Sequence, residues 1–77
     1  MQRKSSETFP QRLRRMRLRR GMTQEGLAIH CYVHENMITH YESGRSMPSA
    51  DVLCKIAEYF EVSVDYILCR TDDPRTF

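Results

Sequence analysis

Apolar residues recur every three to four positions through most of the chain, which is the spacing expected on one face of an α-helix. Capping residues, glycines and prolines separate five such segments, and no segment alternates as a strand would. The pattern predicts an all-α domain with helices over about residues 10–20, 24–31, 35–42, 50–60 and 64–69.

Each helix after the first is preceded by an apolar residue that can pack against another apolar residue five positions later. These pairs are Met22 with Leu27, Val33 with Ile38, Pro48 with Leu53, and Val62 with Ile67. The first helix has the capping-box spacing of Thr8 and Gln11, with Pro10 in its first turn. Outside the helices, we expect residues 1–7 to form a basic flexible arm and residues 71–77 a tail that is frayed or is an arm ordered by a partner.

The apolar faces of these helices are expected to meet in one small core, because 77 residues suffice for a single domain. In the first helix, the same periodicity leaves Arg12, Arg15 and Arg19 mostly outside. The expected core contains Leu13, Met16, Leu27, Ala28, Cys31, Val33, Ile38, Tyr41, Val52, Leu53, Ile56, Ala57, Phe60, Val62, Val64, Ile67 and Leu68.

Positive charge is concentrated at the start of the chain. The net charge is +2, but residues 1–20 sum to +7, residues 21–50 to −2 and residues 51–77 to −3. The planar fork of arginine can donate two hydrogen bonds to one phosphate, so this block suits a polyanion. A helix with a solvated basic face accounts for the same block equally well.

Membrane, secreted and enzymatic classes are not favoured by the sequence. No apolar run approaches the ~20 residues of a membrane span, and no apolar segment typical of a secretory signal follows the basic start. Cys31, Cys54 and Cys69 are odd in number and lie in apolar contexts, so we expect reduced, inert thiols in a cytoplasmic protein. His30, His34 and Cys31 lack a suitably spaced fourth ligand, so no metal, cofactor or catalytic centre is expected.

The second and third predicted helices are joined by a short turn near Tyr32, and the third has a distinct polar face. Val33, Ile38 and Tyr41 commit that helix to the core. The side chains expected to point outward are therefore Glu35, Asn36, Thr39 and His40. Two helices arranged in this way, with short polar groups on the second, describe a helix-turn-helix.

The chain resembles the helix-turn-helix domain of the Cro and phage-repressor family, also called the xenobiotic-response-element family. The resemblance covers about residues 9–70 and lies in RLRRMRLRRGMTQEGLA and ITHYESGRSMPSADVLCKIAEYFEVSVDYIL. It implies a compact five-helix, lambda-repressor-like domain of bacterial or phage origin that regulates transcription, most simply as a repressor, by binding double-stranded DNA as a homodimer. No small-molecule ligand is expected. Candidate dimer-interface residues are Tyr59, Tyr66, Cys69 and Phe77.

The resemblance also implies structural and phosphate-contact roles for single residues. Arg17 and Glu42 match a buried ion pair that ties the first helix to the third. Gln24 matches a glutamine that binds a phosphate with help from the N-terminus of its helix. Arg45 matches a loop position used against the phosphate backbone, and a free surface arginine is the alternative there. The expected phosphate contacts are Gln24, His34, Arg45 and Arg14.

The outward face of the third helix is expected to read base edges in a major groove. By their chemistry, Asn36 can bond adenine bidentately and Glu35 can accept from the amino group of cytosine. Thr39 can meet a thymine methyl, and His40 can donate to guanine or to phosphate. Glu35 and Asn36 are expected to reach deepest because they begin the helix.

Four positions depart from the family pattern. Tyr32 stands where glycine is preferred, Gly26 lies inside the second helix, and His34 replaces the usual Ser or Thr cap. Glu35 adds a carboxylate to a helix without Lys or Arg, which repels phosphates. These departures keep open a second hypothesis, in which an antitoxin-like or adaptor module uses the same face to bind another protein.

Overall fold

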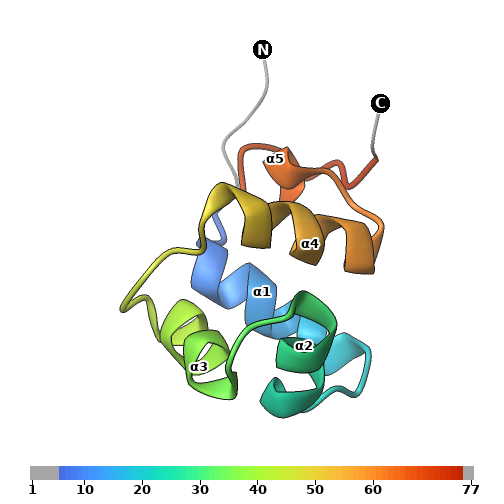
Figure 1. Ribbon diagram of the computed structural model, residues 1–77. Helices are drawn as coiled ribbons and strands as arrows, with labels where there is room; N and C mark the ends of the chain where they lie inside the picture. The colour runs from blue at the N-terminus through green and yellow to red at the C-terminus, as the bar shows by residue number, and fades with distance from the viewer. Residues whose placement is uncertain (1–5, 76–77) are drawn as a thin grey trace.

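Five helices form the part of the chain that the structure describes, residues 6–75 of this computed structural model (Figure 1). They are α1 (Phe9–Arg19), α2 (Gln24–Cys31), α3 (Glu35–Ser43), α4 (Ala50–Phe60) and α5 (Val64–Ile67). Residues 6–75 contain no strand, so the predicted all-α class is confirmed. Residues 1–5 of the expected arm lie outside the described residues.

The helix boundaries agree with the expected ones to within two residues. α2 and α4 match the prediction, α1 is shifted by one residue, and α3 is longer by one. α5 ends at Ile67 because Cys69 takes a left-handed conformation, with φ of 62°, and its N–H donates to the carbonyl of Tyr66. A tight turn therefore replaces the last expected residues of this helix.

The ends of α2 and α3 explain three of the unusual residues. Thr23 caps α2 by accepting from the N–H of Gly26 at 2.9 Å, and a Cβ on Gly26 would lie only 3.2 Å from the Thr23 hydroxyl oxygen. Glycine therefore leaves room for this cap. His34 caps α3, because its Nδ1 accepts from the N–H of Asn36 at 3.1 Å. Tyr32 takes the left-handed conformation that glycine usually supplies, with φ of 58°.

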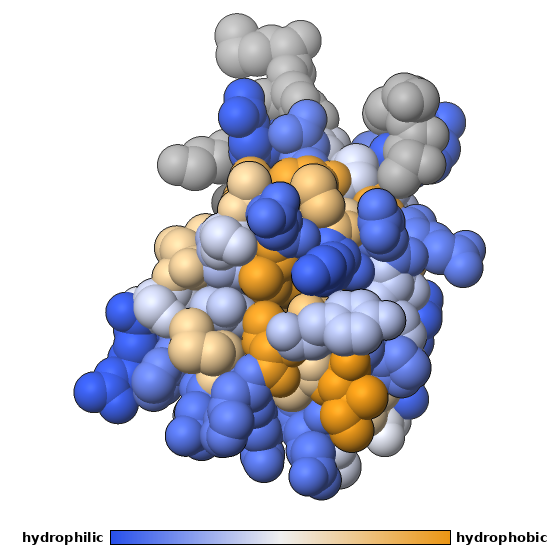
Figure 2. Space-filling model, in the orientation of Figure 1, coloured by the Kyte–Doolittle hydropathy of each residue, from blue (hydrophilic) through white to orange (hydrophobic). Residues whose placement is uncertain are grey.

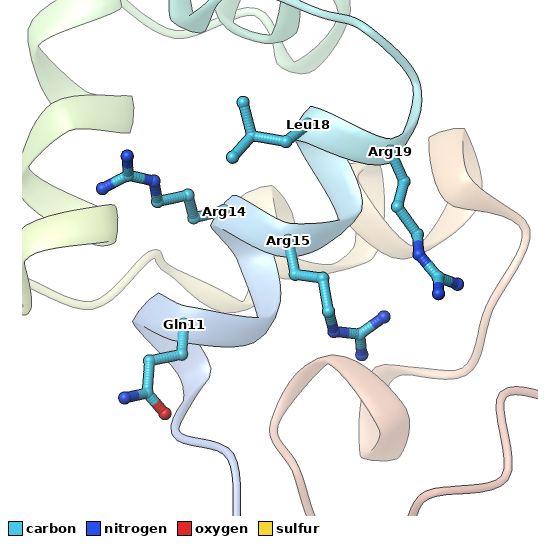
Figure 3. Close-up of a pocket in the computed structure, with 5 residues that line it drawn as sticks. All are labelled: Gln11, Arg14, Arg15, Leu18 and Arg19. Carbon is cyan, nitrogen blue, oxygen red and sulfur yellow. The ribbon is translucent and has the colours of Figure 1, made fainter.

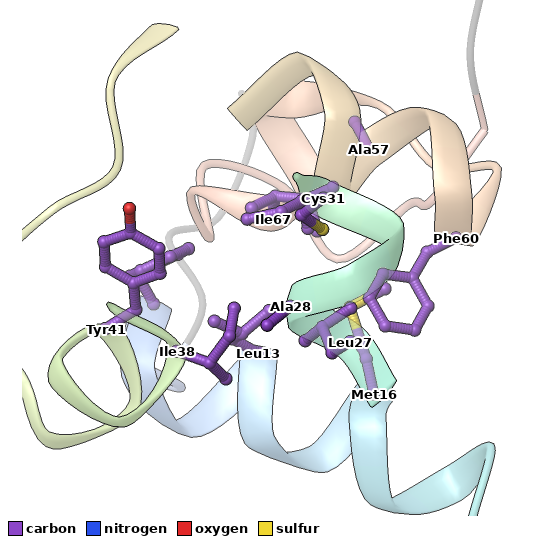
Figure 4. Close-up of a cluster of buried hydrophobic side chains, with 12 residues drawn as sticks. Leu13, Met16, Leu27, Ala28, Cys31, Ile38, Tyr41, Ala57, Phe60 and Ile67 are labelled. Carbon is purple, nitrogen blue, oxygen red and sulfur yellow. The ribbon is translucent and has the colours of Figure 1, made fainter. Parts of the chain in front are cut away.

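The core draws one fully buried aliphatic side chain from every helix. These residues are Leu13, Leu27, Ile38, Ile56 and Ile67. Figure 4 shows how Leu13, Leu27 and Ile38 converge from α1, α2 and α3 below α4 and α5. Phe9, at the start of α1, is also buried and was not predicted, whereas the expected core residues Val33, Val52, Leu53, Val62, Val64 and Leu68 are only partly buried.

Arg12 was expected outside, and this prediction was wrong: the residue is only 3% exposed. Its guanidinium donates to the carbonyls of Tyr66 and Thr71, both at 2.8 Å, and to the Asp72 carboxylate at 2.6 Å. Periodicity placed Arg12 on a polar face, but the chain after α5 folds back over that face. The start of the tail is consequently held against the domain, with Thr71 buried and Asp72 bonded to Arg12, whereas Pro74 and Arg75 are exposed.

Glu7 connects the segment just before α1 to the same cluster. Its carboxylate accepts from Arg12 Nε at 2.8 Å and from Arg15 Nε at 2.6 Å, so Arg15 is also less exposed than expected. The hydrogen bond from Arg15, together with that from Arg12, lowers the pKa of Glu7 from 4.5 to about 2 despite the opposing effect of burial. The last residue of the expected arm thus belongs to the packed domain.

The predicted ion pair between Arg17 and Glu42 is present. Arg17 Nε donates to Glu42 Oε2 at 2.6 Å and Nη2 donates to Oε1 at 3.0 Å, and the two side chains are 9% and 5% exposed. Arg17 Nη1 also donates to the carbonyl of Met22 at 2.7 Å. One guanidinium therefore joins α1, the loop that leads into α2, and the end of α3.

Replacing Glu7 with glutamine should lower the free energy of unfolding by about 2 kcal/mol at pH 7, because the variant cannot carry the charge that the two arginines stabilise. The folded-state pKa is depressed, so this stabilisation is present above pH 4.5 and is lost as the pH falls toward about 2. Urea unfolding at pH 7, 4.5 and 3 should show the two proteins converging as the pH falls. A difference that is independent of pH would contradict the carboxylate's role.

Replacing Glu42 with alanine should lower the free energy of unfolding by ~3 to 5 kcal/mol, because Arg17 would remain buried without its partner. The matched control replaces both residues, Arg17→Met with Glu42→Leu, and should recover most of the loss because neither charge remains. Urea titrations followed by circular dichroism would measure both. A single variant that unfolds within about 1 kcal/mol of the wild type would show that the pair does not stabilise the fold.

Candidate nucleic-acid interface

α3 presents an apolar side to the core and a polar side to the surroundings. Ile38 and Tyr41 are buried, whereas Glu35, Asn36 and Thr39 are exposed. In the space-filling view, hydrophilic side chains gather over α3, while an apolar stripe runs over α2 toward α4 (Figure 2). The outward orientation predicted for these polar residues is therefore confirmed, and His40, also predicted to point outward, is half-buried.

Gln24, the first residue of α2, is bonded to two side chains of α3. Its Nε2 donates to Glu42 Oε1 at 3.2 Å, and its Oε1 accepts from the Thr39 hydroxyl at 2.9 Å. The buried ion pair is thereby extended outward through Glu42 and Gln24 to Thr39. Gln24 also stands in the first turn of α2, where backbone N–H groups and the helix dipole favour an anion.

His34 is the N-cap of α3, one residue before the helix begins. Its Nδ1 accepts a backbone hydrogen bond as the helix cap, so this nitrogen carries no proton in this arrangement. The proton of the neutral ring must then be on Nε2, which makes Nε2 a hydrogen-bond donor. His34 is exposed and can therefore donate from Nε2 to a negatively charged oxygen outside the protein.

Most arginines in and just after α1 bind other groups of the protein. Arg12, Arg15 and Arg17 are paired with other groups of the protein, and Arg20, the residue after α1, donates to the carbonyls of Tyr59 and Phe60, both at 3.3 Å. Much of the basic block that suggested a polyanion site is thus structural.

Arg14 and Arg19 are the α1 arginines for which residues 6–75 supply no ion pair or hydrogen bond. Both line a shallow pocket on the outer face of α1, with Gln11, Arg15 and Leu18. Figure 3 shows Arg14 extending toward α3, while Arg15 and Arg19 extend toward the C-terminal part of the chain.

Arg45 supplies a further exposed cation next to α3. It follows Gly44, which ends α3 in a left-handed conformation with φ of 82°, and the N–H of Arg45 donates to the carbonyl of His40 at 2.9 Å. The backbone of this residue is therefore fixed while its side chain extends from the surface. Arg14 and Arg45 together place positive charge beside a helix that carries none of its own.

The described residues offer little for other chemistries. No group of three His, Cys, Asp or Glu side chains in residues 6–75 is arranged to hold a metal ion, and no helix there is long and apolar enough to cross a membrane. Burial raises the pKa of the Cys31 thiol to about 11, which makes it a poor nucleophile. Cys54, which the sequence places in an apolar context, is exposed in the structure.

Three of the expected dimer-interface residues, Tyr59, Tyr66 and Cys69, are buried or make contacts within one copy of the chain. Cys69 is only 6% exposed because the turn after α5 folds it inward, so little of its side chain is available to a second copy. The Tyr66 ring lies under the Arg12 guanidinium at 4.2 Å, and the Tyr59 ring stacks on His30 at 4.4 Å between centroids. Phe77 lies outside the described residues.

The chain is similar in sequence to known helix-turn-helix proteins. The family described as "Helix-turn-helix" matches residues 13–67. An uncharacterized HTH-type transcriptional regulator of Bacillus subtilis, YobD, is 41% identical over 66 residues, which span 86% of this chain and 59% of that protein. The HTH-type transcriptional activator BcrR of Enterococcus faecalis is 35% identical over 60 residues, which span 78% of this chain and 29% of BcrR. The chain therefore matches only part of each relative.

Solved structures share the arrangement of the helices. The P22 c2 repressor, solved with a synthetic operator, has a TM-score of 0.78 at 22% identity, over 82% of this chain and 96% of that one. PlcR of Bacillus thuringiensis, solved with the peptide PapR7 and DNA, has a TM-score of 0.72 at 27% identity, over 80% of this chain and 22% of that one. Because the family match covers more than half of the chain, the chain belongs to the helix-turn-helix family, and it shares its fold with the P22 c2 repressor.

Proposed function

We propose that the protein is a transcriptional regulator that binds double-stranded DNA in a sequence-specific manner, with α3 in the major groove. The observation that carries this proposal is the polar outer face of α3, which is held against the core by Ile38 and Tyr41 and against α1 by the ion pair. Base readout needs short polar groups on a rigid helix, and this helix has both. The operator and DNA present in the P22 and PlcR structures support the same interpretation.

Base recognition is assigned to three polar residues on the outer side of α3, namely Glu35, Asn36 and His40. Asn36 can donate to and accept from adenine, and Glu35 can accept from the cytosine amino group. Both lie in the first turn of α3, which usually reaches deepest into the groove. His40 is half-buried and lies one turn further along, so it contacts a base or a phosphate at the edge of the site.

Phosphate recognition is assigned to groups on both sides of α3. Gln24 and His34 stand at the starts of α2 and α3, where an amide or ring N–H can donate alongside the helix dipole. Arg45 and Arg14 supply the positive charge that α3 lacks, and their contribution should be sensitive to salt. This arrangement offsets the repulsion between Glu35 and the DNA backbone.

A homodimer is the form proposed to act on DNA, because two copies double the small set of contacts that one α3 can make. Repression is the proposed outcome, since occupation of an operator that overlaps a promoter needs no additional contact with the transcription machinery.

Selection from a random duplex DNA pool, at low and at near-physiological salt, should enrich one motif arranged as an inverted repeat. The reason is that the groups on α3 discriminate bases while two-fold symmetry repeats the half-site. Salt-sensitive binding without a motif would reduce the protein to a nonspecific phosphate binder. Failure to bind at either salt would favour the adaptor hypothesis, in which α3 contacts another protein.

Substitutions at Asn36 and Arg45 should separate the two kinds of contact. Asn36→Ala should relax the preference at one base pair and cost ~1 to 3 kcal/mol there, whereas Arg45→Ala should weaken all sequences and flatten the salt dependence by about one phosphate contact. Arg70→Ala, an exposed arginine after α5, is the matched control and should change neither property. Fluorescence anisotropy with the selected operator and its single-base variants provides the measurement. Equal losses from Arg45→Ala and Arg70→Ala would contradict a specific phosphate role.

A further inference from the structure

The hydroxyl of Thr39 already has a partner within the protein. A threonine hydroxyl carries one proton, and here that proton is donated to Gln24 Oε1 over 2.9 Å. The same hydroxyl cannot simultaneously donate to a base or to a phosphate. Thr39 is exposed on α3, so this bond lies at the protein surface beside the residues assigned to base readout.

The Gln24 side chain is held in one orientation by its two contacts. Glu42 offers only acceptor oxygens, so the amide nitrogen of Gln24 must face it, and the amide oxygen then faces the Thr39 donor. A rotated amide would bring its oxygen against the Glu42 carboxylate, which is unfavourable. Of the two hydrogens on Nε2, Glu42 takes one, and the second has no acceptor among residues 6–75.

We propose that Thr39 is a positioning residue whose hydroxyl holds Gln24 for phosphate binding, and that it does not select a base. This inference rests on the proposed function and refines it, because it limits direct readout to Glu35, Asn36 and His40. Glu42, held by its buried pair with Arg17, fixes the amide nitrogen of Gln24, and Thr39 fixes its amide oxygen. The second Nε2 hydrogen is thereby ordered before DNA arrives, which reduces the entropy lost on binding.

Two substitutions of Thr39 separate the roles of its hydroxyl and its methyl group. Thr39→Val keeps a methyl that can meet thymine but lacks the hydroxyl, whereas Thr39→Ser keeps the hydroxyl and lacks the methyl. Thr39→Val should weaken binding about 3- to 10-fold for the selected operator and for all its single-base variants, as loss of one ordinary hydrogen bond would. Thr39→Ser should bind with nearly wild-type affinity and the same base preference.

A double-variant cycle with Gln24→Ala tests whether the effect passes through Gln24. Thr39→Val should cause no further loss in the Gln24→Ala background, because the side chain that it positions is gone. The thermal midpoint of each variant is measured in parallel, and that of Thr39→Val should stay near the wild-type value because the residue is exposed.

Particular results would overturn the inference. A changed base preference in either Thr39 variant would make Thr39 a base reader, and independent losses in the Gln24→Ala background would separate Thr39 from Gln24. In both cases the wild type still selects a motif, so the proposed function survives. Absence of DNA binding by the wild type would instead remove the proposed function and this inference together.

Discussion

The orientation of the helix-turn-helix depends on one buried ion pair. Arg17 holds Glu42 near the end of α3 and, through a third hydrogen bond, the Met22 carbonyl just before α2. Both helices of the motif are therefore positioned relative to α1 by a single guanidinium. Because an interior charge is costly to leave unpaired, the pair tolerates little displacement, and Glu42 passes this constraint to Gln24 on the surface.

The chain uses much of its positive charge on itself. Arg12 and Arg15 bind Glu7 near the start of the domain, and Arg12 also binds Asp72 near its end, so the segments before α1 and after α5 are held at one cluster. The block of +7 in residues 1–20 consequently overstates the charge available to a polyanion. In the proposed complex, the cations among residues 6–75 that would attract DNA are then few, chiefly Arg14 and Arg45, and helix N-termini would add to them.

Local signals predicted the fold well because caps, staples and apolar spacing are properties of adjacent residues. They placed all five helices and the outward face of α3, and the family resemblance supplied the Arg17–Glu42 pair. They could not place Arg12, whose carbonyl partners at Tyr66 and Thr71 are more than 50 residues away in the sequence. The Gln24–Thr39 bond was missed for a similar reason, since both side chains were assigned to DNA without considering each other.

The acidic character of α3 has a consequence for how recognition can work in the proposed complex. Glu35 can accept from cytosine, but it repels the acceptor edges of guanine and the phosphates on either side. Such a residue discriminates by rejecting wrong bases and adds little net attraction, so the affinity has to come from elsewhere. A pre-oriented Gln24, the cations that flank α3 and a second copy of the protein each contribute without relaxing that discrimination. This surface therefore favours a domain that binds DNA weakly as a single copy, selects strongly among sequences, and gains affinity when two copies bind together.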